Sequence, residues 1–463
     1  MHVRGKTHRL AAALMSGAII STGIWAGGGL ASAAPSAARA QPAAHAQAAA
    51  PAQAKAHAQP AAHAQAAQLG QAIRDHAVPA RPDATMTFEV LDGVYCTSRS
   101  NCWTVGLRAT TDAFTAQARQ WNGRTWVKHS IPSPGGTGPG SVTEPAAVRC
   151  ASAAECWTVG FYGKSGGPSL NLMLRWNGRR WSAMSVPQPA GTGKTSGNFL
   201  DDVTCSSARN CWAVGDFGKT NSSTLNLVLH WNGKKWSRLR VPEPGGTGKK
   251  AENKLNNVRC PTSSRCIAVG SYTNGSGKTF SQVLIWNGRS WFNQPVPSPG
   301  SGTANNASVL FSLGCGPKNC WAVGTFGPSS GRPSLNQVLH WNGRSWSRQF
   351  TTQPAGTGKA AQNNLGWVTC TSDRDCWAVG DYGNQGPVTS RNQALHWNGK
   401  RWAFVHTPNP AGTALNDQNV LLSDRCPSSS DCWAVGAQVS GSGNVVHEIL
   451  HWNGKKWSVW PPA

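Results

Sequence analysis

The sequence predicts an all-β protein, a seven-bladed β-propeller with four antiparallel strands per blade and one repeat per blade. A pattern that begins at Cys205 and continues through Cys-Trp-Ala-Val-Gly to His-Trp-Asn-Gly recurs seven times, with a period of 54 to 56 residues. Each copy contains four short apolar runs, separated by Gly, Pro and Asn, which favour turns. One such unit cannot bury its apolar faces alone, so the seven units must pack against one another.

The third copy illustrates the four expected strands, which span 200–205, 211–215, 225–231 and 236–241. Asn-Gly separates the last two, and this dipeptide is the strongest short signal for a β-hairpin. Two tryptophans flank that turn and can form a cross-strand aromatic pair. A third tryptophan follows the second cysteine in six copies, and Ile267 replaces it in the fourth. These three positions hold 20 of the 23 tryptophans, and such regularity predicts core packing rather than a sugar-binding platform.

The 14 cysteines fall into seven local pairs, one pair in each copy. Each pair would face across the hairpin that joins the first two strands, and closing so short a loop stabilises by roughly 2 kcal/mol. Zinc sites usually have closer cysteine spacing and further ligands nearby, so we expect disulfides in an exported protein. The expected pairs are Cys96–Cys102, Cys150–Cys156, Cys205–Cys211, Cys260–Cys266, Cys315–Cys320, Cys370–Cys376 and Cys426–Cys432.

The N-terminal segment predicts export. Arg4, Lys6 and Arg9 precede a short apolar stretch and an Ala-Ser-Ala cleavage site that ends at Ala33. We therefore expect a signal peptide at 1–33, an Ala/Gln/Pro-rich disordered linker at 34–85 and the propeller at 86–463, secreted as a monomer without membrane insertion. The expected blades lie near 88–134, 143–189, 198–244, 253–299, 308–354, 363–410 and 419–463.

The charge is strongly positive, with a formal net charge of +24. This balance favours an anionic partner such as nucleic acid, an acidic glycan or a wall polymer, and it is equally compatible with a role in solubility. Cations after the Asn-Gly turns would form a ring near the outer rim, either as a docking surface for a polyanion or as protection against edge-to-edge pairing. These cations are Arg124, Arg179, Arg180, Lys234, Lys235, Arg289, Arg344, Lys400, Arg401, Lys455 and Lys456.

The order of these motifs, with Leu-His-Trp-Asn-Gly-x-x-Trp followed by Val-Pro-x-Pro, resembles the kelch repeat of galactose-oxidase-like propellers. The sequence departs from that repeat in having a single glycine (Gly160, Gly215, Gly380), a shorter Trp-to-Trp hairpin and additional disulfides. The hairpin is also similar to an Asp-box turn. Both resemblances imply a propeller, and by resemblance a ligand would bind around the central channel on the face of the long loops.

The first residues of each innermost strand would rim that channel. Counted back from the first cysteine, positions −5 and −2 are mostly apolar, whereas positions −4 and −3 vary between copies. This variation predicts either a ligand site at the channel mouth or positions that simply tolerate solvent. The candidate binding residues are Asp92, Asp201, Asp202, Asn256, Asn257, Ser312, Trp367 and Ser423.

Catalytic patterns are weaker. A copper oxidase would need paired Tyr and His ligands, yet only four tyrosines exist. A sialidase-like site would need convergent arginines, but other blades separate Arg149, Arg259 and Arg425, and no Tyr-Glu pair is evident. The histidines that precede the Asn-Gly tryptophan lie too far out to meet at one metal ion. They are His230, His340, His396 and His451.

We therefore expect no metal, no cofactor and no catalytic residue. The predicted function is a non-enzymatic binding module for a glycan or an anionic extracellular polymer. The alternatives are a carbohydrate-active enzyme with its site at the channel mouth and a scaffold for protein partners.

Overall fold

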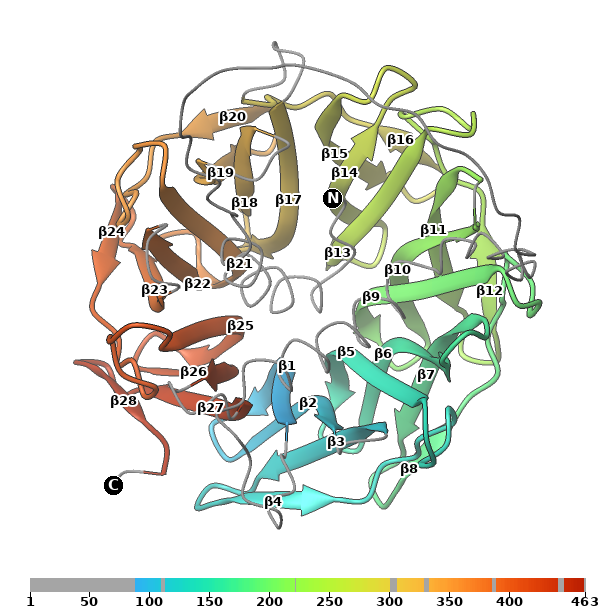
Figure 1. Ribbon diagram of the computed structural model, residues 1–463, viewed down its shortest axis with the longest axis horizontal. Helices are drawn as coiled ribbons and strands as arrows, with labels where there is room; N and C mark the ends of the chain where they lie inside the picture. The colour runs from blue at the N-terminus through green and yellow to red at the C-terminus, as the bar shows by residue number, and fades with distance from the viewer. Residues whose placement is uncertain are drawn as a thin grey trace, which may run out of the picture.

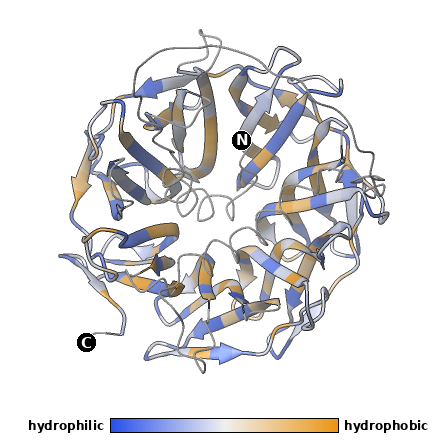
Figure 2. Cartoon of the chain, in the orientation of Figure 1, coloured by the Kyte–Doolittle hydropathy of each residue, from blue (hydrophilic) through white to orange (hydrophobic). Residues whose placement is uncertain are grey.

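The computed structural model describes residues 88–461 except 110–112, 221, 300–305, 329–332, 385–388 and 440–444. These residues form a ring of seven blades, each built from four consecutive antiparallel strands (Figure 1). Apolar segments occur in the strands of all seven blades (Figure 2). The expected signal peptide at 1–33 and linker at 34–85 lie outside the described residues.

The third blade shows how one repeat becomes one blade. It comprises β9 (Ser196–Ser207), β10 (Asn210–Lys219), β11 (Thr224–Trp231) and β12 (Trp236–Leu239), which pair in chain order from the ring axis outward. The first two strands are longer than expected, because their pairing continues on both sides of the repeated Cys-Trp-Ala-Val-Gly segment.

The other six blades repeat this order. The first blade comprises β1 (Phe88–Ser98), β2 (Asn101–Ala109), β3 (Phe114–Trp121) and β4 (Trp126–His129). The second comprises β5 (Ser141–Ser152), β6 (Glu155–Lys164), β7 (Ser169–Trp176) and β8 (Trp181–Ala183). The fourth and fifth are β13 (Glu252–Thr262), β14 (Arg265–Thr273), β15 (Thr279–Trp286) and β16 (Trp291–Asn293), then β17 (Asn306–Cys315), β18 (Cys320–Pro328), β19 (Leu335–Trp341) and β20 (Trp346–Gln349). The last two are β21 (Ala361–Ser372), β22 (Asp375–Asn384), β23 (Thr389–Trp397) and β24 (Trp402–Val405), then β25 (Gln418–Ser428), β26 (Asp431–Val439), β27 (Val445–Trp452) and β28 (Trp457–Val459).

A β-bulge interrupts the innermost strand of every blade, four residues before its first cysteine. The bulge turns a backbone carbonyl toward the glycine that ends Cys-Trp-Ala-Val-Gly. A Cβ atom on Gly215 would lie 2.0 Å from the carbonyl oxygen of Phe199, and the equivalent distances in the other blades are 1.9 to 2.0 Å. The repeated glycine is therefore required by close backbone approach rather than by a turn.

Tryptophans join each blade to the next. The tryptophan after the second cysteine packs against both tryptophans that flank the Asn-Gly turn of the following blade, as Trp212 does against Trp286 and Trp291. Six junctions have this arrangement, with ring centroids 4.5 to 5.4 Å apart. At the remaining junction, Ile267 packs in the corresponding apolar cluster. The expectation that the recurring tryptophans form the core is confirmed.

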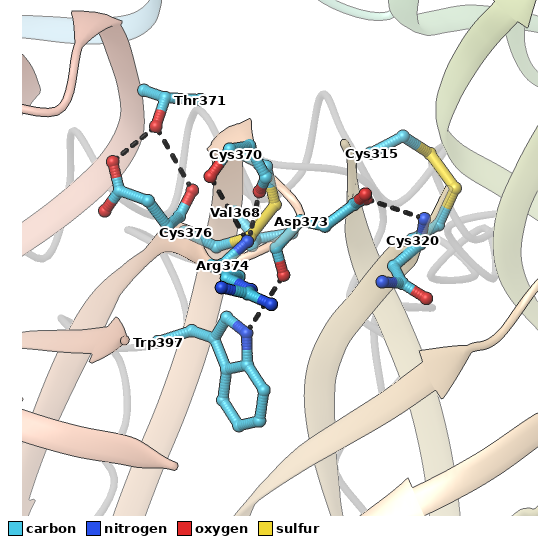
Figure 3. Close-up of a disulfide and its surroundings, with 12 residues drawn as sticks. Cys315, Cys320, Val368, Cys370, Thr371, Asp373, Arg374, Cys376 and Trp397 are labelled. Carbon is cyan, nitrogen blue, oxygen red and sulfur yellow. Dashed lines mark hydrogen bonds between the residues drawn. A yellow bond between two sulfur atoms is a disulfide. The ribbon is translucent and has the colours of Figure 1, made fainter. Parts of the chain in front are cut away.

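All seven expected disulfides are present. The hairpins that carry them lie beside the Asn-Gly turns, and Trp397 donates its indole N–H to the carbonyl oxygen of Asp373 at 3.2 Å (Figure 3). The Asp373 carboxylate also accepts the backbone N–H groups of Lys318 and Asn319 in the shorter hairpin of the fifth blade. Both sets of hairpins therefore lie on one face of the ring, here called the disulfide face.

The ring closes by packing of the seventh blade on the first, and each of these blades is built from its own repeat. Trp433 packs against Trp121, and the Ser423 hydroxyl accepts the backbone N–H of Val94 at 3.3 Å. The prediction that no strand crosses from one end of the chain to the other blade is confirmed for the described residues.

Candidate functional site

The candidate residues at position −3 lie inside the ring, where they join neighbouring blades. The Asp202 carboxylate accepts the backbone N–H of Val258 at 3.1 Å. Asn257 and Ser312 accept the equivalent N–H of the following blade at 3.1 and 3.2 Å, as Ser423 does at the closure. All four are buried. Variation at this position therefore reflects, at least in these blades, alternative acceptors for one inter-blade hydrogen bond.

The candidate residues at position −4 occupy the β-bulges. Asp92, Asp201 and Asn256 are all at most 5 % exposed. The Asn256 side chain donates to the carbonyl oxygen of Leu310 in the next blade at 2.7 Å. Burial leaves these polar groups little surface for an approaching ligand.

Position −1 holds a group that the sequence argument missed. We expected Arg149, Arg259 and Arg425 to stay apart because other blades separate them, and this expectation is wrong. All three lie on innermost strands at the same level of the ring, so intervening blades separate them in sequence but not across the axis. Their charges are close enough that Arg259 and Arg425 both lower the pKa of Arg149, after the larger effect of burial.

Two aromatic rings contact the three guanidinium groups. Arg149 lies between the rings of Tyr95 and Trp367, 5.2 Å from each centroid. Arg425 also lies over the Tyr95 ring, 4.5 Å from its centroid, and Arg259 lies over the Trp367 ring at 5.4 Å. These are cation–π distances, and they place residues from the first, second, fourth, sixth and seventh blades in one continuous stack.

Asp202 of the third blade is the carboxylate that ion-pairs with this stack in the described part of the chain. Its oxygens lie 2.7 Å from Nη1 of Arg259 and 3.6 Å from Nη2 of Arg149. Arg149 also donates to the carbonyl oxygen of Val148 at 2.9 Å. Burial and the neighbouring cations lower the pKa of Arg149 to about 9, so its guanidinium stays protonated at neutral pH.

Asp424 is the exception at position −2, where the other six blades carry Val or Leu. Its side chain is fully buried, and neither carboxyl oxygen has a hydrogen-bond partner among the described residues. Burial raises its pKa well above the ordinary value, although Arg425, Arg259 and Arg149 act in the opposite direction. Burial therefore opposes ionisation of this carboxyl group, while the three neighbouring guanidinium groups favour it.

We call Tyr95, Arg149, Asp202, Arg259, Trp367, Asp424 and Arg425 the arginine cluster. An alignment of the residue before the first cysteine would have shown Tyr, Arg, Thr, Arg, Gly, Thr and Arg in the seven copies. Positions −1 and −3 point to the same side of a strand. The arginines at position −1 could therefore have been grouped with the candidate residues expected at position −3.

The expected outer ring of cations is exposed at every position. In each Asn-Gly turn the asparagine Oδ1 accepts the backbone N–H groups of the next-but-one residue and the one after it, as Asn232 does from Lys234 and Lys235 at 3.0 Å. The same pair of hydrogen bonds recurs in the other six turns. Gly233 takes a φ of 90° there, which suits glycine. We call the eleven cations after these turns the cationic turns.

The four repeated histidines are part of the blades. His230 stacks on Trp212 with 4.2 Å between centroids and bonds to the side chain of Asn210, and His396 and His451 bond to aspartates at the matching position. Within the described ranges, no three His, Cys, Asp or Glu side chains meet in a way that could hold a metal ion. No described helix is long and apolar enough to cross a membrane.

Comparison with known proteins adds little to this picture. No protein-family description and no curated protein matches the chain. Among solved structures, the six-bladed fucose-recognising lectin of the fungus Aleuria aurantia is 13% identical, with a TM-score of 0.38 over 70% of this chain and 95% of the lectin. A prolyl endopeptidase is 11% identical, with a TM-score of 0.47 over 86% of this chain and 54% of that protein.

The α-L-arabinanase of Penicillium chrysogenum, solved with arabinobiose, is 11% identical, with a TM-score of 0.39 over 65% of this chain and 90% of the enzyme. These similarities are too low to support any argument about function. The strand pairing itself establishes the seven-bladed ring, and the seven disulfides indicate an oxidising environment.

Proposed function

We propose that this protein is a secreted, non-enzymatic binding module for an anionic extracellular polymer, which it contacts through the cationic turns. One observation carries the proposal. Seven turns of the same geometry hold exposed Lys or Arg at equivalent places around the disulfide face, and the first residue after each glycine is always a cation.

A ring of this kind suits a long polymer better than a small ligand. Each exposed cation contributes only modestly, because water and salt screen it. A polyanion can contact several turns at once, and each contact displaces counterions, so the contributions add. The excess of basic residues from Met86 onward, 36 against 17 acidic, gives the propeller as a whole a net positive charge that attracts polyanions.

The test uses binding of polygalacturonate, an acidic glycan, by the whole chain. We expect the affinity to fall steeply as salt is raised. A variant in which Lys234, Lys235, Lys400, Arg401, Lys455 and Lys456 are all replaced by Gln should bind about tenfold more weakly or worse, with an unchanged circular dichroism spectrum and melting temperature.

A matched control removes the same charge from the opposite face. The exposed lysines Lys164, Lys194, Lys219, Lys249, Lys250 and Lys359 lie at the far ends of the second strands or in the connections between blades. If their replacement by Gln weakens binding as much as replacement in the cationic turns, the net charge rather than the ring is responsible, and the proposal fails. It also fails if neither variant binds more weakly than the wild type.

The kelch-like resemblance is compatible with this proposal, and export by the N-terminal segment is part of it. Carbohydrate cleavage and a protein partner are the alternatives. Hydrolysis of a glycan by the wild-type chain, or binding that does not change with salt, would favour one of these instead.

A further inference from the structure

The arginine cluster has more positive charge than its described neighbours neutralise. Arg149, Arg259 and Arg425 approach one another near the ring axis, whereas Asp202 is the one described carboxylate within ion-pair distance of them. Apolar residues at the ring axis would avoid the free-energy cost of burying charge, and position −2 is apolar in six blades. Three neighbouring guanidinium groups with one paired carboxylate are destabilising, and a bound anion would stabilise them.

Two of the three arginines keep donors for such an anion. Arg425 makes no hydrogen bond and no ion pair with the described residues, and its buried Nε has no acceptor. Arg259 uses Nη1 for both of its hydrogen bonds, to Asp202 and to the carbonyl oxygen of Val258. Its Nη2 and Nε are therefore available to another acceptor. The desolvated, unpaired donor on Arg425 is costly, and an oxyanion would satisfy it.

The same two arginines are also the reachable ones. Arg259, Arg425 and Tyr95 remain partly exposed, whereas Arg149, Trp367 and the two aspartates are buried. The buried Arg149 therefore contributes charge, while the partly exposed groups supply the contacts. Tyr95 lies three residues before β1 ends at the disulfide face, so we expect a ligand to approach from the face that carries the cationic turns.

We propose that Arg259, Arg425 and Tyr95 bind a carboxylate group at the ring axis, with the carboxylate of a uronic acid as the chemistry that fits best. Guanidinium groups bind planar carboxylates through paired hydrogen bonds, and the Tyr95 hydroxyl can serve a neighbouring sugar hydroxyl. This site is separate from the cationic turns and would take a single sugar acid rather than a polymer. The proposal stands on the arginine cluster alone and does not require the proposed function.

The test is calorimetric titration of the whole chain with glucuronate, acetate, sulfate and glucose at constant ionic strength. We expect glucuronate to bind more tightly than acetate, and glucose not to bind. Arg425→Gln should weaken glucuronate binding at least tenfold. Arg344→Gln, which removes an exposed arginine from an Asn-Gly turn, should leave it unchanged and is the matched control.

Stability without a ligand separates a binding role from a structural one. Arg425 makes no hydrogen bond or ion pair with the described residues and repels Arg149, which offsets its contact with the Tyr95 ring. Arg425→Gln should therefore melt no lower than the wild type in chloride alone. The wild type should gain thermal stability when glucuronate is added, and the variant should lose that gain. A lower melting temperature of the variant in chloride would mean that Arg425 supports the fold, and would overturn the proposal.

The remaining outcomes also decide the matter. Equal binding of acetate and glucuronate would restrict the site to small carboxylates, and stronger binding of sulfate would overturn the assignment to a carboxylate. No binding of any anion by the wild type would overturn the site itself. The variant with six Gln in the cationic turns should still bind glucuronate, so failure of this proposal and failure of the proposed function are distinguishable.

Discussion

The glycine that ends Cys-Trp-Ala-Val-Gly is required by the pairing of the two innermost strands. The sequence shows one glycine here where kelch repeats have two, and it does not explain why this glycine is needed. The β-bulge supplies the reason, because it brings the carbonyl oxygen of Phe199 to within 2.0 Å of the place where a Cβ on Gly215 would lie. The opposing atom belongs to the backbone, so a side-chain rotation cannot relieve the contact.

Gly215→Ala should therefore destabilise the protein by about 3 kcal/mol or more. The control is Gly248→Ala, at an exposed position where an added Cβ would meet nothing within 4 Å, and it should change stability by less than about 0.5 kcal/mol. Chemical denaturation of both variants measures the difference. Equal stability of the two would mean that the bulge relaxes freely.

The tryptophan junctions explain why one repeat cannot fold by itself. The tryptophan after the second cysteine completes its packing only against the next blade, so each blade supplies part of its neighbour's core. The fourth blade has an isoleucine in place of this tryptophan, and the residue paired with it on the next strand also differs from that of the third blade. Ile267 faces Ile285, where the third blade has Trp212 facing His230. The two substitutions belong together.

A double-mutant cycle tests this pairing. Ile267→Trp alone should destabilise by about 1–3 kcal/mol through overpacking of a buried site. Ile285→His alone should cost a similar amount, because it buries a polar ring without its stacking partner. Together they recreate the pair of the third blade, so the double variant should be more stable than the sum predicts by at least about 0.5 kcal/mol. Additive effects in urea denaturation would contradict the pairing.

The closure between the last and first blades contains a histidine that lies between a carboxylate and a guanidinium group. His447 contacts Glu89 through Nδ1 at 2.8 Å and Arg119 through Nε2 at 2.9 Å. Only a neutral imidazole can donate to the carboxylate and accept from the guanidinium at the same time. Burial, followed by the charge of Arg119, accordingly lowers the pKa of His447.

This arrangement should make the closed ring sensitive to acid. A histidine whose pKa is lowered by folding takes up its proton more readily in the unfolded chain, so stability falls as pH drops below its ordinary pKa of 6.5. His447→Asn introduces the residue found at this position in the second, third, fifth and sixth blades. We expect the melting temperature of the variant to decrease less than that of the wild type when the pH is lowered from 8 to 5. A parallel decline of both proteins would contradict a role for His447.

The fold was predictable because every blade solves the same packing problem, and a period of about 55 residues makes that solution visible seven times. The disulfide pairs and the Asn-Gly turns followed from spacing within one repeat. The arginine cluster did not, because its members lie in different repeats and meet only when the ring closes. Aligning the repeats shows that Arg149, Arg259 and Arg425 share one level, but not that aromatic rings from two further blades contact them.

The contact of Trp433 with Trp121 indicates that the chain should tolerate circular permutation. This contact joins the two ends of the propeller, yet it repeats the packing found within the continuous chain. Chain order therefore imposes nothing on the ring that packing does not already provide. A circular permutant that joins the two ends with a linker and opens between β12 and β13 should form the same propeller, with the former seam as an ordinary junction.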